Sequence, residues 1–219
     1  MIKKILIVLA VAIVALAGFI STRPDTFTVQ RSATIQAPAD MVFAKVNDFH
    51  NWAEWSPWEK LDPKMKRTFT GAKAGLDAMY EWTGNKDVGS GRMTIQESKA
   101  TELVRIRLEF LEPFPSTSTT TFAFAPEGQG TKVTWTMDGK HNFMSKAMCL
   151  VVDMDKMIGK DFEEGLSNMT KAAEAEAKKH AEEKALAEKA AADAAAAPPA
   201  APAPAEGQPA AGTAAAPAP

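Results

Sequence analysis

Few side chains in this 219-residue sequence have the chemistry and the setting for acid–base catalysis. Of the three histidines, His180 lies in a stretch of Ala, Glu and Lys that we expect to be solvated, which leaves His50 and His141. Tyr80, the single tyrosine, and Glu81 are adjacent in a segment that alternates apolar and polar residues. Because a general acid or base must reach the reacting atoms, the catalytic candidates are His50, Tyr80 and Glu81.

No familiar metal or nucleophile motif accompanies these candidates. The histidines have no metal-ligand spacing, and no Gly-rich phosphate loop or GxSxG segment is present. The single cysteine, Cys149, excludes an internal disulfide and a multi-cysteine metal site, and we interpret it as a buried structural thiol. The sequence therefore predicts neither a metal nor a cofactor.

Charge excludes one class of partner. The 25 Lys and Arg residues are balanced by 27 Asp and Glu residues, and no basic excess favours nucleic acid.

The segment HNWAEWSPWE, residues 50–59, concentrates aromatic surface. Trp52, Trp55 and Trp58 recur every three residues and can share one side of a short helical turn. They serve either as core aromatics that close one end of a sheet or as a wall against a ligand. Of the three, Trp55 is the residue that we expect to contact a ligand.

The N-terminus, residues 1–23, has the character of a membrane segment. Lys3 and Lys4 precede an uncharged run from Ile5 to Ile20, which falls between a signal-peptide core and the ~20 residues that cross a bilayer. We favour an uncleaved signal anchor, with cleavage near Ala17 as the alternative. The lysines predict a cytoplasmic N-terminus, so the rest would be exported, in a bacterium to the periplasm.

The C-terminal end changes composition twice. Residues 171–196 are Ala, Glu and Lys, which favours a solvated helical extension. Residues 197–219 are rich in Pro and Ala, and we predict a disordered tail.

Residues 24–170 predict an α+β domain. Residues 27–36 alternate as a half-buried strand in which Arg31 is the odd residue, and a short helix follows Pro38. Six further segments of strand character are separated by short turns, of which PEGQG at residues 126–130 is the clearest, so neighbouring strands must be antiparallel.

The segment from Asn142 to Met169 predicts one long amphipathic helix over the apolar face of this sheet. Asn142 can cap its start, and apolar residues, many of them methionine, recur at helical spacing. Gly159 and Gly165 each cost roughly 1 kcal/mol against Ala in a helix, so we expect backbone very close to the sheet at both.

Several strings, among them DFHNWAEWSPWEKLDPKM, YEWTGNKDVGSGRMTI and MDKMIGKDFEEGL, resemble the polyketide-cyclase-like branch of the START and birch-pollen-allergen (SRPBCC) superfamily. The resemblance covers about residues 25–175. It implies a helix-grip fold, in which a seven-stranded antiparallel curved sheet wraps around a long C-terminal helix and encloses a cavity. It does not imply one activity, since the superfamily contains lipid carriers, hormone receptors and cyclases.

The function that we predict is a membrane-anchored, exported domain that binds a hydrophobic or amphipathic, lipid-like molecule. A cyclase or hydrolase that uses the same cavity, and an envelope interaction or stress protein with a cavity filled by side chains, are the alternatives. The residues expected to line the cavity are Trp55, Trp58, Tyr80, Trp82, Met93, Ile95, Ile106, Phe122, Trp135, Met144, Met148, Val151 and Ile158.

Overall fold

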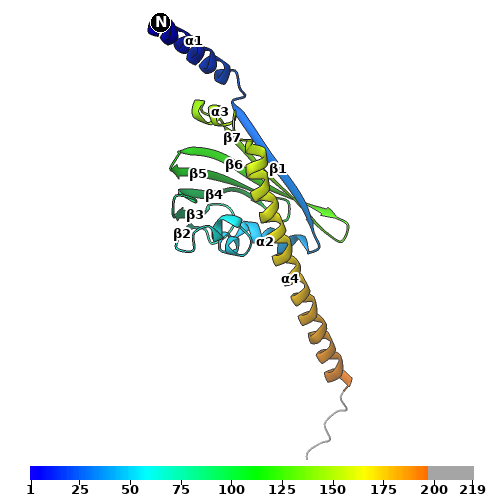
Figure 1. Cartoon of the computed structure of the whole chain (residues 1–219). Coiled ribbons are helices and arrows are strands. Elements are labelled where there is room, and N and C mark those ends of the chain that lie inside the picture. The colour runs from blue at the N-terminus through cyan, green and yellow to red at the C-terminus, as the bar shows by residue number, and fades with distance from the viewer. Residues whose placement is uncertain (197–219) are drawn as a thin grey trace, which may run out of the picture. The chain divides into compact units, whose positions relative to one another are not determined.

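The computed structural model describes residues 1–196, so the Pro/Ala tail predicted for residues 197–219 lies outside the described residues. Helices and strands follow in the order expected of a helix-grip domain (Figure 1). Their bounds are α1 Ile2–Ser21, β1 Thr26–Ile35, α2 Ala39–Asn47, η1 Phe49–Glu54, η2 Pro57–Lys60, β2 Lys66–Gly71, β3 Ala78–Thr83, β4 Ser90–Lys99, β5 Leu103–Glu112, β6 Ser116–Glu127, β7 Gly130–Lys140, α3 Phe143–Met148 and α4 Met154–Ala196.

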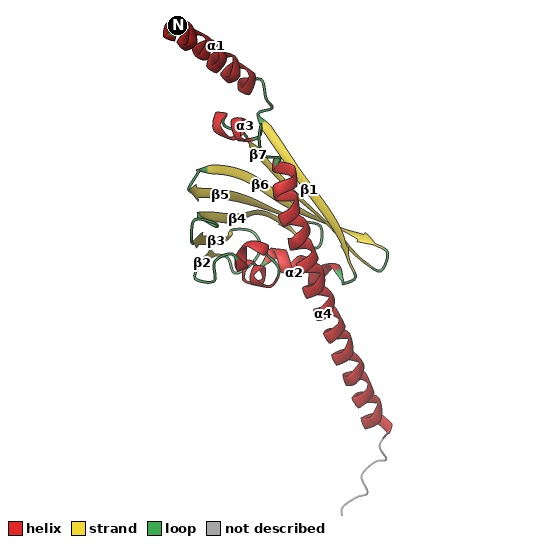
Figure 2. Ribbon diagram, viewed as in Figure 1, coloured by secondary structure: helices red, strands yellow, loops and turns green. Residues whose placement is uncertain are grey.

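The seven strands form one antiparallel sheet in the order β1-β7-β6-β5-β4-β3-β2. The predicted turn at residues 126–130 is the β6–β7 hairpin, where Gly128 has a positive φ of 61° that glycine adopts without strain. The sheet is curved, and α4 runs across one of its faces (Figure 2). The predicted fold class is thus confirmed.

Alternation along the strands builds the core as the sequence predicts. In β1, Val29 and Ile35 are buried while their neighbours Thr28 and Thr34 are exposed. The same pattern buries one face of every central strand, and residues such as Ile95, Ile106, Phe122 and Val133 lose all contact with solvent on this face.

The expected single helix from Asn142 is two helices. Asn142 does cap a helix, because its side chain accepts a hydrogen bond from the Ser145 amide at 2.8 Å, but α3 ends after one and a half turns. Helix α4 starts just after Asp153, whose side chain accepts a hydrogen bond from the Lys156 amide at 3.1 Å. The two β-branched residues between the helices, Val151 and Val152, favour this break.

Both predicted close approaches of α4 to the sheet are confirmed. A Cβ atom on Gly159 would lie 1.9 Å from the Arg31 guanidinium, and one on Gly165 would lie 2.8 Å from the Trp135 ring. Packing also continues past the expected boundary at residue 170, since Ala173 is fully buried and Ala177 packs against the core. Small side chains fit where the helix lies nearest to the sheet.

Helix α1 is 20 residues long, or about 30 Å, which matches the hydrocarbon core of a bilayer. Its apolar side chains are exposed except for Ile20 in the last turn. Such a helix is compatible with a single-pass membrane anchor and with a signal sequence.

Candidate ligand-binding cavity

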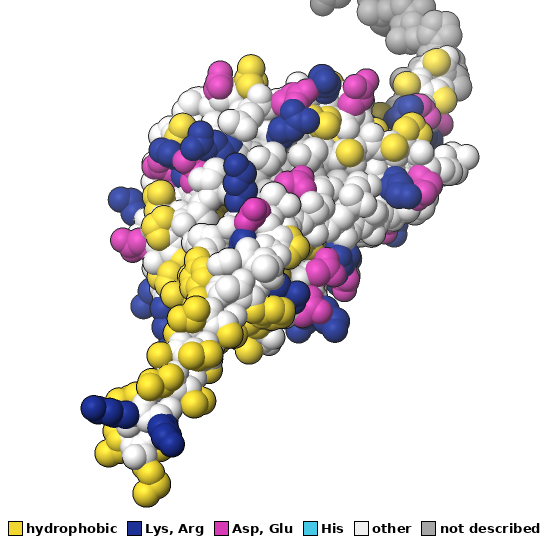
Figure 3. Space-filling view, turned by 90° about the horizontal axis from the view of Figure 1, so that it is seen from above, with side chains coloured by type: hydrophobic (Ala, Val, Ile, Leu, Met, Phe, Trp, Pro, Cys, Tyr) yellow, Lys and Arg dark blue, Asp and Glu magenta, His cyan; other side chains and the backbone are white. Residues whose placement is uncertain are grey.

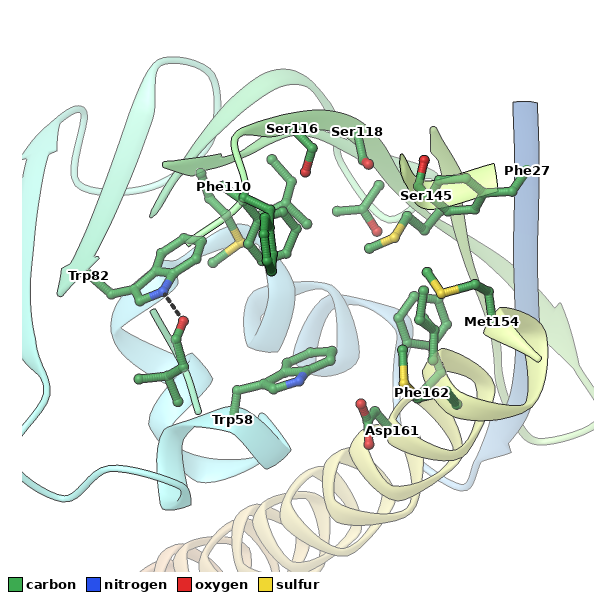
Figure 4. Close-up of a pocket in the computed structure, with 18 of the residues that line it drawn as sticks. Phe27, Trp58, Trp82, Phe110, Ser116, Ser118, Ser145, Met154, Asp161 and Phe162 are labelled. Carbon is green, nitrogen blue, oxygen red and sulfur yellow. Dashed lines mark hydrogen bonds between the residues drawn. The ribbon is translucent and has the colours of Figure 1, made fainter. Parts of the chain in front are cut away.

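A cavity of about 480 Å³ lies between the sheet and the helices α3 and α4. Figure 4 shows its wall: Trp58 and Trp82 on one side, Phe110 from the sheet, and Met154 and Phe162 from α4. A volume in this range suits a small apolar molecule.

Stacked aromatic rings form the inner wall. The rings of Trp135 and Phe162 are parallel with centroids 3.9 Å apart, and the Trp58 ring meets both edge-on. Gly165, one turn beyond Phe162, gives the Trp135 ring its room. These rings therefore join the sheet to α4.

Trp82 closes another part of the wall. Its indole N–H donates to the Val88 carbonyl at 3.1 Å (Figure 4), and its ring meets Phe110 edge-on. The ring lies over Gly91 of the neighbouring strand, where a Cβ atom would be 2.4 Å from the indole. Any other residue at this position would push the Trp82 ring away.

One polar group in the wall is fully engaged with protein. The Glu59 side chain, 8% exposed, accepts a 2.6 Å hydrogen bond from the Tyr80 hydroxyl and a 2.6 Å charged bond from Arg67 Nε. Burial raises the pKa of the Tyr80 hydroxyl, and the Glu59 carboxylate raises it further. The Tyr80 hydroxyl therefore stays protonated. Its role is to orient the Glu59 carboxylate and not to transfer a proton.

A second acid, Asp161 on α4, also lines the cavity. Burial raises the pKa of its carboxyl, and the charge of Glu164 adds to this effect. The Trp58 side chain acts in the opposite direction. Asp161 is thus an ionisable group beside the aromatic side chains of the wall.

Most of the predicted lining residues meet at this cavity. Met144 and Met148, which were expected on the long final helix, line the cavity from the separate helix α3. The residues that line the cavity as predicted are Trp58, Tyr80, Trp82, Met93, Trp135, Met144, Met148 and Ile158.

Five of the predicted lining residues do not line it. Trp55, Ile95, Ile106 and Phe122 are completely buried in the core, beneath the side chains that reach the cavity. The Trp55 indole N–H donates to the Lys45 carbonyl at 2.9 Å, which fixes this ring towards α2. Val151 lies in the break between α3 and α4 and is 85% exposed.

Tryptophan spacing alone does not identify the ligand-facing rings. The segment forms two separate 3-10 helices, η1 and η2, with Trp55 between them. Trp52 and Trp58 line the cavity, whereas Trp55 packs at 4.7 Å against Trp52 on the core side.

Two of the catalytic candidates lie away from the cavity lining. His50 is half exposed, stacks on Phe69 with centroids 4.2 Å apart, and its Nδ1 lies 2.7 Å from an oxygen of Asp48. Glu81 is also half exposed and faces Arg92 at 3.8 Å on the other side of its strand. Only Tyr80 lines the cavity.

The structure brings together a histidine and a cysteine that the sequence did not pair. His141 Nε2 lies 3.9 Å from Cys149 Sγ, and His141 lines the cavity near its α3 wall. Cys149 is half-buried rather than buried, because it caps the end of the short helix α3 instead of lying inside a long one. Among residues 1–196, no group of three or more His, Cys, Asp or Glu side chains is placed to hold a metal ion.

Comparison with solved structures places this fold among known ones. One half of the di-domain aromatase/cyclase BexL from the BE-7585A biosynthetic pathway superposes with a TM-score of 0.52 at 15% identity, covering 71% of this chain and 52% of BexL. Protein CV1439 from Chromobacterium violaceum has a TM-score of 0.49 at 16% identity, covering 69% of this chain and 99% of its own. The major latex-like protein 151 from Panax ginseng has a TM-score of 0.47 at 13% identity, covering 70% and 99%.

Among curated proteins, no significant sequence match was found. The family model described as polyketide cyclase/dehydrase and lipid transport matches residues 26–174, which include all seven strands and the first part of α4. The chain therefore belongs to the polyketide cyclase/dehydrase and lipid-transport family.

Proposed function

We propose that this protein is an exported, membrane-anchored domain that binds a hydrophobic or amphipathic, lipid-like molecule between its sheet and α4. The observation that carries this proposal is an open cavity of about 480 Å³ with a wall of aromatic and methionine side chains. Burying apolar ligand surface contributes about 25 cal/mol per Å² before association costs are subtracted.

The engagement of Glu59, one polar group of the wall, supports binding over acid–base catalysis. Both oxygens of Glu59 are engaged by Tyr80 and Arg67, so neither is free to take a proton from a ligand. The volume of the cavity also argues against the alternative in which side chains fill it.

Membrane attachment and export are argued from the N-terminus. The exposed apolar surface of α1 has the length of a bilayer core, and Lys3 and Lys4 precede it. Positive residues favour the cytoplasmic side, which puts the domain on the other side of the membrane, the periplasm of a bacterium.

Binding is tested with the full-length protein in detergent and an apolar fluorescent probe such as a naphthalene dye. We expect saturable binding that changes tryptophan fluorescence, since Trp58 and Trp82 line the cavity. Mass spectrometry of the purified protein then identifies any co-purified ligand.

Two matched substitutions distinguish the cavity from other apolar surface. Ile158→Trp, in the α4 wall, should fill the cavity and abolish probe binding. Leu186→Trp adds the same ring at an exposed position of the same helix and should leave binding unchanged. Equal binding by wild type and folded Ile158→Trp would show that the probe binds elsewhere and would defeat the proposal.

A further inference from the structure

The register of the strands brings several lining segments of the cavity to the same end of the strands. Thr26, the first residue of β1, pairs with Lys140, the last of β7, and Ser116 at the start of β6 pairs with Phe110 near the end of β5. The β5–β6 turn and helix α3, which follows β7, therefore emerge at the same end of the strands as the start of β1. Both segments supply lining residues of the cavity, including Phe114 and Met148.

Large apolar side chains are exposed to solvent at this end of the strands, and we call this group the rim. From the turn, Phe114 is 74% exposed; from α3 and the loop after it, Met144 is 67% and Val151 85% exposed. The rim consists of Phe114, Phe143, Met144, Met148 and Val151, all of which are exposed. Figure 3 shows hydrophobic side chains gathered on this face of the domain. Such clustering marks an interaction surface.

The chain itself indicates what covers the rim. Only Thr22–Asp25 separate the end of α1 from Thr26, so these two points are at most about 18 Å apart. The opposite end of the strands lies nine residue steps further along β1, about 31 Å at 3.4 Å per residue. With α1 in a bilayer, the rim end of the strands therefore stays within about 18 Å of the end of α1, whereas the opposite end can lie much further from the membrane.

Charges of both signs lie at this end of the strands, where Asp25 of the linker pairs with Lys146, and two further cations can meet lipid headgroups. Arg23 lies in the linker, with its guanidinium 5.3 Å from the Phe19 ring, and the exposed Lys140 ends β7. Cations beside an apolar patch are the arrangement that inserts between lipid headgroups.

We propose that the rim docks into the same phospholipid bilayer that holds α1, so that a ligand passes between the bilayer and the cavity without crossing water. This inference rests on the proposed function, because it assigns a source to the ligand of that cavity. The rim then has a bilayer as its partner, and its side chains form a continuous apolar path to the cavity wall.

Docking is tested with full-length protein in phospholipid vesicles that contain chain-labelled quencher lipids. The native cysteine is first removed by Cys149→Ser. A fluorophore is then attached at one of two rim positions, Phe114→Cys or Val151→Cys. The control is Gln129→Cys, in the exposed β6–β7 turn at the opposite end of the strands. We expect strong quenching at the two rim positions and none at position 129. Rim labels quenched no more than the control, whether they face water or a protein partner, would overturn the proposal.

Loading is measured in the same vesicles with the naphthalene dye dissolved in the bilayer. The double variant Phe143→Asp, Val151→Asp should slow loading by at least about tenfold, because a charge opposes insertion. Neither residue lines the cavity, so the variant should bind the dye in detergent with wild-type affinity. Unchanged loading would contradict docking while leaving the binding function standing; a wild type that binds no dye in detergent would defeat both.

Discussion

Arg31 of β1 lies directly over Gly159 of α4, and its guanidinium bonds both Asp155, at 3.0 Å, and Glu163, at 2.7 Å. This is the residue that breaks the apolar alternation of the first strand. Its side chain replaces a core contact with a clamp on the first turns of the helix, where Met154 and Ile158 line the cavity. Glycine at 159 is what lets the guanidinium lie flat on the helix backbone.

The clamp predicts that two substitutions are coupled. In the wild type, Gly159→Ala should stabilise less than helix propensity predicts, since the new methyl pushes the guanidinium aside and weakens its ion pairs with Asp155 and Glu163. In an Arg31→Ala background the same change should stabilise by about 0.5–1 kcal/mol, the helix propensity of Ala over Gly. Chemical denaturation of the four proteins measures this coupling, and additive effects would contradict the clamp.

Gly165 should behave differently, because its neighbour is rigid. A methyl group there would lie 2.8 Å from the Trp135 ring and 3.3 Å from Pro57 Cδ. We expect Gly165→Ala to cost about 1–3 kcal/mol of unfolding free energy, as overpacking does. Thermal melting in parallel with Gly18→Ala, at a glycine with no atom within 4 Å of a Cβ, provides the control.

Replacing Asp161 by Asn should raise the stability of the folded protein at neutral pH but not in acid. Burial raises the pKa of its carboxyl in the folded state, so the unfolded chain ionises first as the pH rises. The folded state therefore loses stability as the pH rises from the unfolded pKa to the folded pKa. Asp161→Asn should melt higher than wild type at neutral pH and equal to it well below about pH 3.9.

Asp155 on the same helix provides a control of opposite sign. The Arg31 guanidinium lowers the pKa of the Asp155 carboxyl, so Asp155→Asn should reduce stability at neutral pH and have no such effect in acid. If Asp161→Asn lowers the melting temperature at neutral pH, as Asp155→Asn should, the burial argument for Asp161 is wrong.

Truncation tests where the domain ends. A chain that stops at Lys178 keeps Ala173 and Ala177 on the core and should melt with the midpoint of the full chain. A chain that stops at Asn142 lacks α4 and leaves the apolar face of the sheet uncovered, and we expect it to be insoluble. A large drop in melting temperature for the first chain would mean that the following residues pack on the domain.

Topology is tested by fusing a reporter that is active only after export behind Pro219. Because Lys3 and Lys4 precede α1, we expect an active reporter and protein that stays with membranes after a carbonate wash. An inactive reporter would contradict export. A soluble product with a new N-terminus near Gly18 would retain export and replace the anchor with a cleaved signal peptide.

Much of the fold could be predicted because each strand buries alternate residues. Sets such as Met93 and Ile95, or Val133 and Trp135, carry that period in the sequence and are buried in the structure. The break between α3 and α4 at Val151 could not be predicted, because apolar residues at helical spacing continue across it. The Asp153 side chain that caps α4 gives only a local signal against this continuous pattern.

The cavity was harder to predict than the fold for a related reason. Alternation states which face of a strand is apolar but not how deep a side chain lies, so Ile106 and Trp82 share a pattern although only Trp82 reaches the cavity. Glu59 and Asp161 gave no apolar signal at all. Their role depends on Tyr80, Arg67 and Trp58, which only the folded chain brings near.

The attachment of α1 to the first residue of β1 has a mechanical consequence. In the membrane-anchored state that we propose, a pull on α1 enters β1 at Thr26 through residues 22–25 and runs along this strand, whose ten residues pair in one register with β7. Such a pull loads the rungs of this ladder together, in shear, instead of opening them one after another from an end. The edge strand of the sheet is thereby the one suited to bear tension, and Arg31 passes part of that load to α4.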